Sequence, residues 1–108
     1  VGFSASSQRW IADLILAQRG ELQAFNTQMR DSAWTLSLLC LRLACIFAQE
    51  RTRTALPELR LLSLGTNHFE LQILSKNWLE THPLIKFLLG CEVSHWKAVQ
   101  YTFDFRYC

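Results

Sequence analysis

The side chains able to do chemistry are thinly spread along this sequence. Its three histidines, His68, His82 and His95, form no HD, HExxH or HxH pair, so each is expected to be structural. Carboxylates number nine, yet no two stand in an apolar setting suited to acid-base catalysis. The four glycines are too scattered for a phosphate loop. We therefore expect no catalytic residue, no metal site and no cofactor within these residues.

The cysteines point to a reducing environment. Cys40, Cys45, Cys91 and Cys108 form no C-x-x-C pair, and no histidine stands at a zinc-finger spacing from them. Cys40 and Cys45 fall five residues apart in one apolar segment, where buried thiols behave as small apolar side chains. No signal peptide opens the sequence. These features predict reduced thiols and a cytoplasmic protein.

Three arginines form the candidate binding site. Arg51 and Arg53 follow the end of a predicted helix, and Arg60 stands on the first predicted strand. Guanidinium groups match phosphate oxygens in pairs, so these residues could bind a polyanion weakly. The alternative is that all three are solvated charges that complement the helix dipole. A formal net charge of +2 is too small to indicate nucleic-acid binding.

The other elements are expected to pack around the segment 33–47. Its apolar residues recur at spacings of three and four, which predicts a helix with one strongly apolar face. That stripe comprises Leu36, Leu39, Leu43, Ile46 and Phe47. Apolar residues also fill much of the opposite side, which is typical of a helix buried on several sides. A membrane span is disfavoured, because Arg42 stands at the centre and the run is shorter than the ~20 residues a bilayer requires.

The remaining elements predict an α+β fold. A first helix starts after an N-cap at Ser4 and stops near Gly20, and Asp31 or Ser32 caps the central helix at 31–49. After Pro57 the apolar period changes from 3.6 to 2, and a Gly-Thr-Asn turn joins two strands into a hairpin. A helix and a final strand follow. We predict a helical segment at 1–55 and a β-β-α-β subdomain with an antiparallel sheet at 56–108.

The predicted elements carry more apolar surface than one small domain can bury. Leu62, Leu64 and Leu74 lie on the hairpin face expected to be polar, and Leu38 and Leu41 lie on the back of the central helix. Extended apolar patches usually mark interfaces. We therefore expect self-association or a covering neighbour, and excision of this chain from a longer protein.

Four motifs in order resemble the Ppx/GppA phosphatases, the exopolyphosphatases and guanosine pentaphosphate phosphohydrolases. Leu41-Arg42-Leu43-Ala44, followed by Ile46-Phe47 and Arg51/Arg53, is similar to the family's L-R-L-A segment. Trp78-Leu79-Glu80-Thr81-His82-Pro83-Leu84 is similar to its W-L-x-x-H-P-L signature. The set is completed by Glu92, one turn before Trp96, and by Gly2-Phe3-Ser4 at the start.

The resemblance implies the C-terminal region of such an enzyme, with an HD-like helical part and a small terminal subdomain. It implies that catalysis and a divalent metal, Mg, belong to N-terminal actin-like domains that would be this region's partners, and that the parent is a homodimer. It also implies polyphosphate or guanosine pentaphosphate as substrate, with the choice left open. The alternative is a free-standing protein-interaction module without an enzymatic parent.

Overall fold

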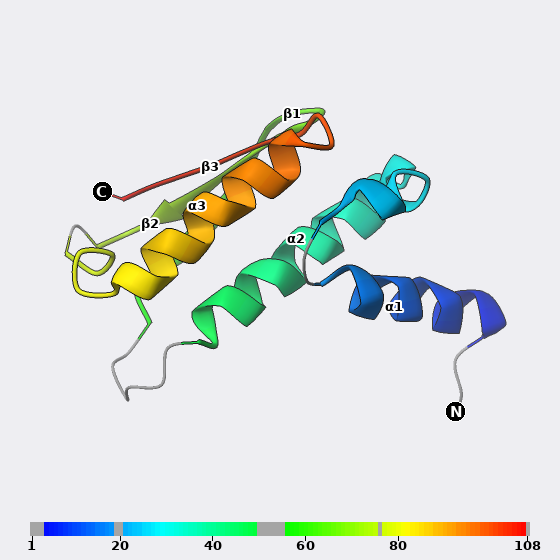
Figure 1. Ribbon diagram of the computed structural model, residues 1–108, viewed down its shortest axis with the longest axis horizontal. Helices are drawn as coiled ribbons and strands as arrows, with labels where there is room; N and C mark the ends of the chain where they lie inside the picture. Colours follow the sequence, from blue (N-terminus) through cyan, green and yellow to red (C-terminus); the bar gives the residue numbers. More distant parts are fainter. Residues whose placement is uncertain (1–3, 19–20, 50–55, 76, 108) are drawn as a thin grey trace. The chain divides into compact units, whose positions relative to one another are not determined.

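The structure, a computed structural model, describes residues 4–18, 21–49, 56–75 and 77–107. Its elements, in chain order, are α1 (Ala5–Ala17), η1 (Gln23–Phe25), η2 (Gln28–Arg30), α2 (Ser32–Phe47), β1 (Leu59–Gly65), β2 (His68–Ile73), α3 (Pro83–Lys97) and β3 (Thr102–Tyr107) (Figure 1). The predicted order, helices followed by β-β-α-β in an α+β fold, is confirmed.

The chain divides by its internal contacts into two compact units, Val1–Cys45 and Ile46–Cys108. The boundary predicted after residue 55 adjoins residues 50–55, which lie outside the described part of the chain, and it stays a prediction.

Side-chain caps start both helices of the first unit. The backbone N–H of Ser7 donates to Ser4 Oγ at 3.1 Å, and Asp31 Oδ1 accepts from the N–H groups of Ala33 and Trp34 at 3.0 and 3.3 Å. These bonds satisfy amides that the first turn of a helix leaves without partners. The predicted caps at Ser4 and Asp31 are confirmed, and η1 and η2 span the polar connection between the two helices.

The buried face of α2 differs from the predicted stripe. Leu39 and Leu43 are buried as expected, but Leu36 is 43% exposed. Leu38, which we expected on an exposed back surface, is fully buried. The predicted patch on the back of this helix is therefore wrong at Leu38. The reason is that a helix with apolar residues on two sides buries both sides. Leu38 and Leu39, which are neighbours in the sequence, are therefore both buried.

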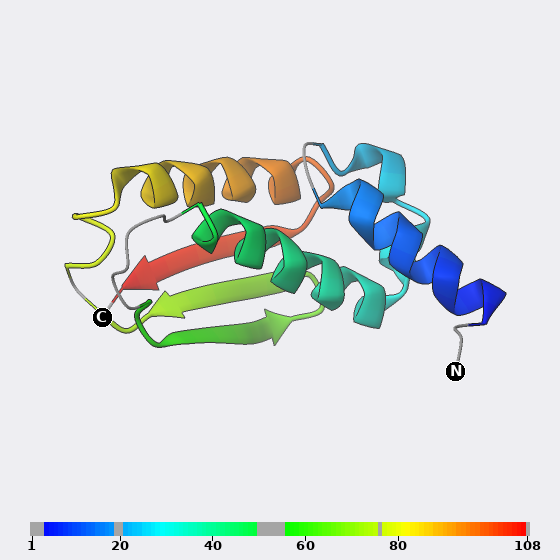
Figure 2. The same cartoon turned by 90° about the horizontal axis from the view of Figure 1, so that it is seen from below.

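The sheet of the second unit is mixed. β1 pairs antiparallel with β2, but β3 pairs parallel with β2, in the order β1-β2-β3 (Figure 2). The expectation of a wholly antiparallel sheet is therefore wrong for β3. The physical reason is α3: the helix carries the chain back along the sheet, so the next strand starts from the same end as β2.

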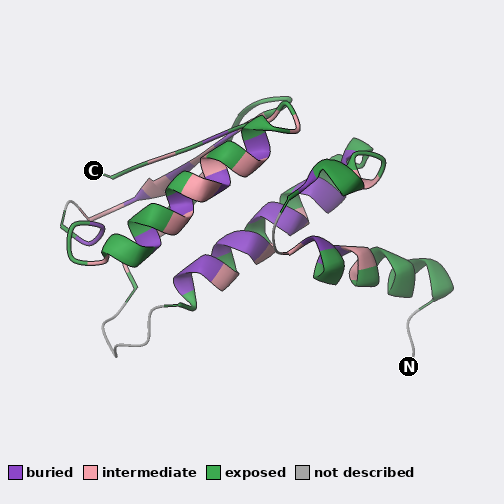
Figure 3. Cartoon of the chain, in the orientation of Figure 1, coloured by how far each residue is buried: buried purple, intermediate pink, exposed green. Residues whose placement is uncertain are grey.

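One face of this sheet and one face of α3 form the core of the second unit. Phe69, Leu71 and Ile73 alternate along β2 with less buried residues, and Phe103 is fully buried on β3. α3 contributes Ile85, Leu89, Glu92 and Trp96, spaced three and four apart. Figure 3 shows buried and exposed bands alternating along α3. The Phe69 and Trp96 rings meet edge to face with centroids 6.5 Å apart.

The three leucines expected on the second face of the hairpin differ in their surroundings. The β1–β2 register shifts between Ser63 and Gly65, which places Leu64 in an irregularity where it is 53% exposed. Leu62 and Leu74 are half-buried, and Leu62 pairs with the charged Glu70. Leu62 therefore shares its face with a charged side chain, and the covering of this face by a neighbour stays a prediction.

Gln100 ends α3 in a conformation that favours glycine. Its φ is +66°, its N–H donates to the Lys97 carbonyl, and the N–H of Tyr101 donates to the Trp96 carbonyl. This is the Schellman pattern, whose left-handed residue is usually glycine. Gln100→Gly is therefore expected to raise the free energy of unfolding by about 1 kcal/mol. Urea unfolding measures it, with Ala98→Gly, at φ −62°, as a control that should lower stability. Equal effects of the two changes would contradict the explanation.

Candidate functional site

Of the three arginines predicted to bind a polyanion, Arg60 alone can be placed. Arg51 and Arg53 lie outside the described residues. Arg60 is exposed on β1, directly opposite Gln72 of β2. The convergence of Arg51 and Arg53 with Arg60 therefore stays a prediction.

The sheet register places Arg106 in the same cross-strand row as Arg60. Gln72 pairs with Arg60 on one side and with Arg106 of β3 on the other. Residues directly opposite each other point to the same face, with side chains roughly 5 Å apart at their bases. We call Arg60, Gln72 and Arg106 the guanidinium row. Sequence reasoning missed Arg106, because nothing near it in the sequence indicates which strand it lies beside.

Two ion pairs balance much of the charge on this face. Arg106 Nε lies 3.1 Å from Glu70 Oε1, and His68 Nε2 lies 3.1 Å from Asp104 Oδ2. Gln72 Nε2 also donates to Glu70 Oε2 at 3.3 Å. Within the described part of the chain, none of the ion pairs involves Arg60. Arg60 is thus the cation of the row best placed to accept an external anion.

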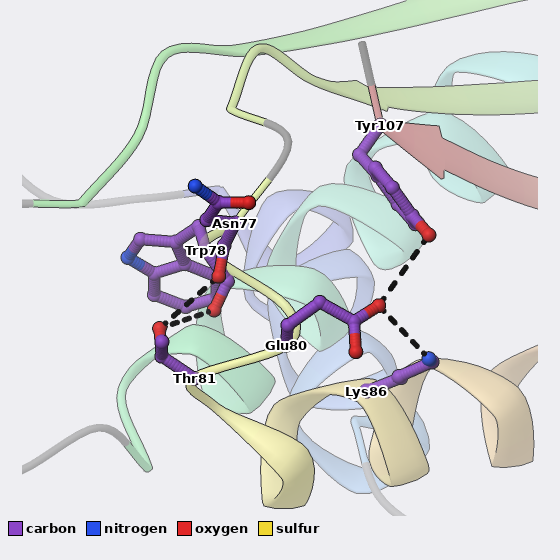
Figure 4. Close-up of polar contacts among 6 residues, drawn as sticks. All are labelled: Asn77, Trp78, Glu80, Thr81, Lys86 and Tyr107. Carbon is purple, nitrogen blue, oxygen red and sulfur yellow. Dashed lines mark hydrogen bonds and ion pairs between the residues drawn. The ribbon is translucent and has the colours of Figure 1, made fainter.

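The turn that precedes α3 is held by its own side chains. Thr81 Oγ1 donates to the carbonyl oxygens of Trp78 and Asn77 at 2.9 and 3.2 Å (Figure 4). The imidazole of His82 stacks on the Trp78 indole with ring centroids 4.0 Å apart. His82 occupies the N-cap position of α3, but its side chain makes no capping bond. Its Nδ1 instead lies 2.6 Å from the Trp78 carbonyl, so the residue stabilises the turn.

Glu80 links this turn to the neighbouring elements. Its Oε1 lies 3.5 Å from Lys86 Nζ on α3 and accepts from the Tyr107 hydroxyl on β3 at 3.4 Å (Figure 4). All three side chains are substantially exposed. Exposed pairs of this kind contribute little to stability.

The other residues that carry the sequence motifs have structural roles. Arg42 is 2% exposed, and its Nη1 donates to the Ala17 carbonyl at 2.9 Å. Glu92 is 5% exposed, and its Oε2 accepts from Trp96 Nε1 at 2.9 Å. A buried polar or charged group is stable only when it has a hydrogen-bond partner. The Ala17 carbonyl is that partner for Arg42, and the Trp96 indole is that partner for Glu92.

Three further observations on the described residues concern metal binding, disulfides and membrane spanning. No three His, Cys, Asp or Glu side chains gather among them as a metal site requires. The structure forms no disulfide among Cys40, Cys45 and Cys91, while Cys108 lies outside the described residues. Across the described ranges, no helix is both long and apolar enough to cross a bilayer.

Comparison with known families decides the relationship. The model of the Ppx/GppA phosphatase family, domain III, matches residues 1–93. The chain belongs to the Ppx/GppA phosphatase family. The matched residues run from the first unit through most of α3, and β3 follows them. In this Ppx/GppA chain, the motif residues Arg42, Trp78 and Glu92 are therefore parts of a domain III scaffold.

Proposed function

We propose that this chain is a non-catalytic accessory region of a phosphohydrolase that cleaves terminal phosphoanhydrides of polyphosphate or guanosine pentaphosphate. The family match over residues 1–93 carries the proposal, because domain III is one part of a multidomain enzyme. Its partners would be the N-terminal catalytic domains of the same protein, which would hold the magnesium. A second copy of the protein would complete a homodimer.

We further propose that the guanidinium row contacts the anionic substrate. Arg60 is exposed and stands in one row with Arg106. Guanidinium groups present forked donors that match phosphate oxygens in pairs. The ion pair between Arg106 and Glu70 is largely exposed on the arginine side, so a polyanion can compete for Arg106 at modest cost. The row therefore supports weak binding that depends on salt.

Replacing both arginines is expected to weaken polyanion binding. Arg60→Ala with Arg106→Ala should reduce the affinity of the chain for long polyphosphate about tenfold at low salt. It should also reduce the slope of log affinity against log salt by about 2, since two phosphate contacts are lost. Lys86→Ala with Lys97→Ala is the matched control, because it removes two exposed cations of the same unit and the same net charge.

The two double variants separate site binding from general electrostatics. Equal losses of affinity in both would contradict a specific role of the row. A phosphate-release assay with magnesium accompanies these titrations. The chain is expected to release no phosphate from polyphosphate. Release of phosphate by the chain itself would overturn the non-catalytic proposal.

A further inference from the structure

The outer edge of β1 presents backbone groups for a further strand. The sheet has the order β1-β2-β3, so within the described ranges β1 has a neighbouring strand on one side only. The Glu58 carbonyl accepts from the N–H of Leu74, just beyond the end of β2. Because the peptide groups of a strand point alternately to its two sides, Arg60 also bonds toward β2. The N–H and C=O groups of Leu59 and Leu61 therefore point away from the sheet.

Opposite charges flank Leu59 on this edge. Glu58 and Arg60 are both exposed, and they point to the same face of the sheet because they are two residues apart. Within the described part of the chain, neither takes part in an ion pair. If a second copy pairs antiparallel about a two-fold axis at Leu59, each Glu58 lies opposite the Arg60 of the other copy. The edge is therefore complementary to itself in this register.

Neighbouring registers of the same pairing lack this match. Outward-pointing groups of the two copies face each other only when the axis lies level with a residue. An axis at Glu58 or at Arg60 places two like charges directly opposite each other, which destabilises a strand pair. An axis at Leu61 or Leu62 leaves Arg60 opposite a leucine. Charge therefore selects the axis at Leu59.

The same register also covers apolar surface at the ends of the pairing. Leu56 is 54% exposed, and Leu62 is half-buried. Leu56 precedes Pro57, which favours extended backbone, so it would continue the pairing opposite Leu62 of the second copy. Pro57 has no N–H, but its carbonyl can accept from the N–H of Leu61. Leucine thus meets leucine at both ends of the pairing.

The other edge of the sheet, formed by β3, is less suited to a second copy. α3 packs against β3 and lies on that side of the sheet, whereas β1 lies on the far side (Figure 2). Two copies paired through β3 would bring their α3 helices together beside the shared axis. Pairing through β1 keeps the two α3 helices apart.

We propose that β1 pairs with β1 of a second copy, antiparallel about Leu59, to form a continuous sheet with three strands from each copy. The proposed function names a second copy without a contact surface. This surface rests on strand geometry and charge alone, so it requires neither the accessory role nor polyanion binding. Arg60 keeps donors for a polyanion, since a guanidinium has five N–H groups and a carboxylate pairs with two. One strand pair buries little area, so the dimer is expected to be weak.

Charge reversal tests the register, measured by sedimentation of the whole chain without any polyanion. Glu58→Arg and Arg60→Glu, each alone, place like charges opposite each other and are expected to weaken the dimer at least about tenfold. An equimolar mixture of the two variants restores opposite charges at every position, so dimers are expected to return in the mixture. Lys97→Glu, which reverses an exposed cation on α3, is the matched control and should leave dimerisation unchanged.

Hydrogen exchange provides a readout for the backbone. The N–H groups of Leu59 and Leu61 are expected to gain protection as the concentration rises, whereas that of Arg60, already bonded toward β2, should change little. The outward N–H groups of β3, at Phe103 and Phe105, should not respond. A monomer at every concentration, a dimer that survives both single reversals, a mixture that stays monomeric, or protection that rises on β3 in place of β1 would each overturn the proposal.

Discussion

Leu43→Ala is expected to lower the free energy of unfolding by about 2–5 kcal/mol, the range for leucine truncation in a packed core. Leu43 is 7% exposed, on the buried face of α2 that also contains Leu39. Truncation removes three carbon atoms, one methine and two methyl groups, from that face and leaves a space that the neighbours fill only partly. Urea unfolding of the 108-residue chain, monitored by tryptophan fluorescence, measures the change.

Leu36→Ala is the matched control on the same helix. Leu36 is 43% exposed, so its truncation should change stability by less than about 0.5 kcal/mol. Both variants remove the same atoms and carry the same helix propensity, so the difference between them reports burial alone. Comparable losses at the two positions would show that the buried face of α2 is assigned incorrectly.

Arg42→Ala is expected to destabilise the first unit by about 2–4 kcal/mol. The guanidinium is buried and donates to the Ala17 carbonyl, the last residue of α1. Loss of the donor leaves that carbonyl buried and unsatisfied, which costs about 1–3 kcal/mol. The aliphatic part of the side chain is lost as well, which leaves a gap beside the helix.

Two further variants separate these contributions. Arg42→Met keeps most of the aliphatic volume, so its loss should be smaller and should reflect mainly the orphaned carbonyl. Arg30→Ala removes an exposed arginine from η2 and should cost less than about 0.5 kcal/mol. Hydrogen exchange provides a second readout: protection of the C-terminal amides of α1 should fall in Arg42→Met. Unchanged protection of these amides, together with a small loss of stability in Arg42→Ala, would contradict the expectation that the bond from Arg42 to the Ala17 carbonyl stabilises the end of α1.

Local chemistry made much of the fold predictable. The caps at Ser4 and Asp31, the helical period of α2 and the change of period after Pro57 all depend on residues close in the sequence. Such signals are local because a helix cap or a hairpin turn is formed by neighbours along the chain. The ordered motifs likewise sufficed to recognise the Ppx/GppA family, which the match to domain III confirms.

Contacts between distant residues needed the tertiary structure. Only the parallel pairing of β3 with β2 placed Arg106 in one row with Gln72 and Arg60. The bond from Arg42 to Ala17 spans 25 residues, and no local pattern announces it. Side-chain period shows which face a residue occupies, whereas register and packing decide what that face meets. The sequence by itself therefore determined the elements and the family, and the tertiary structure decided which charged groups share one face of the sheet.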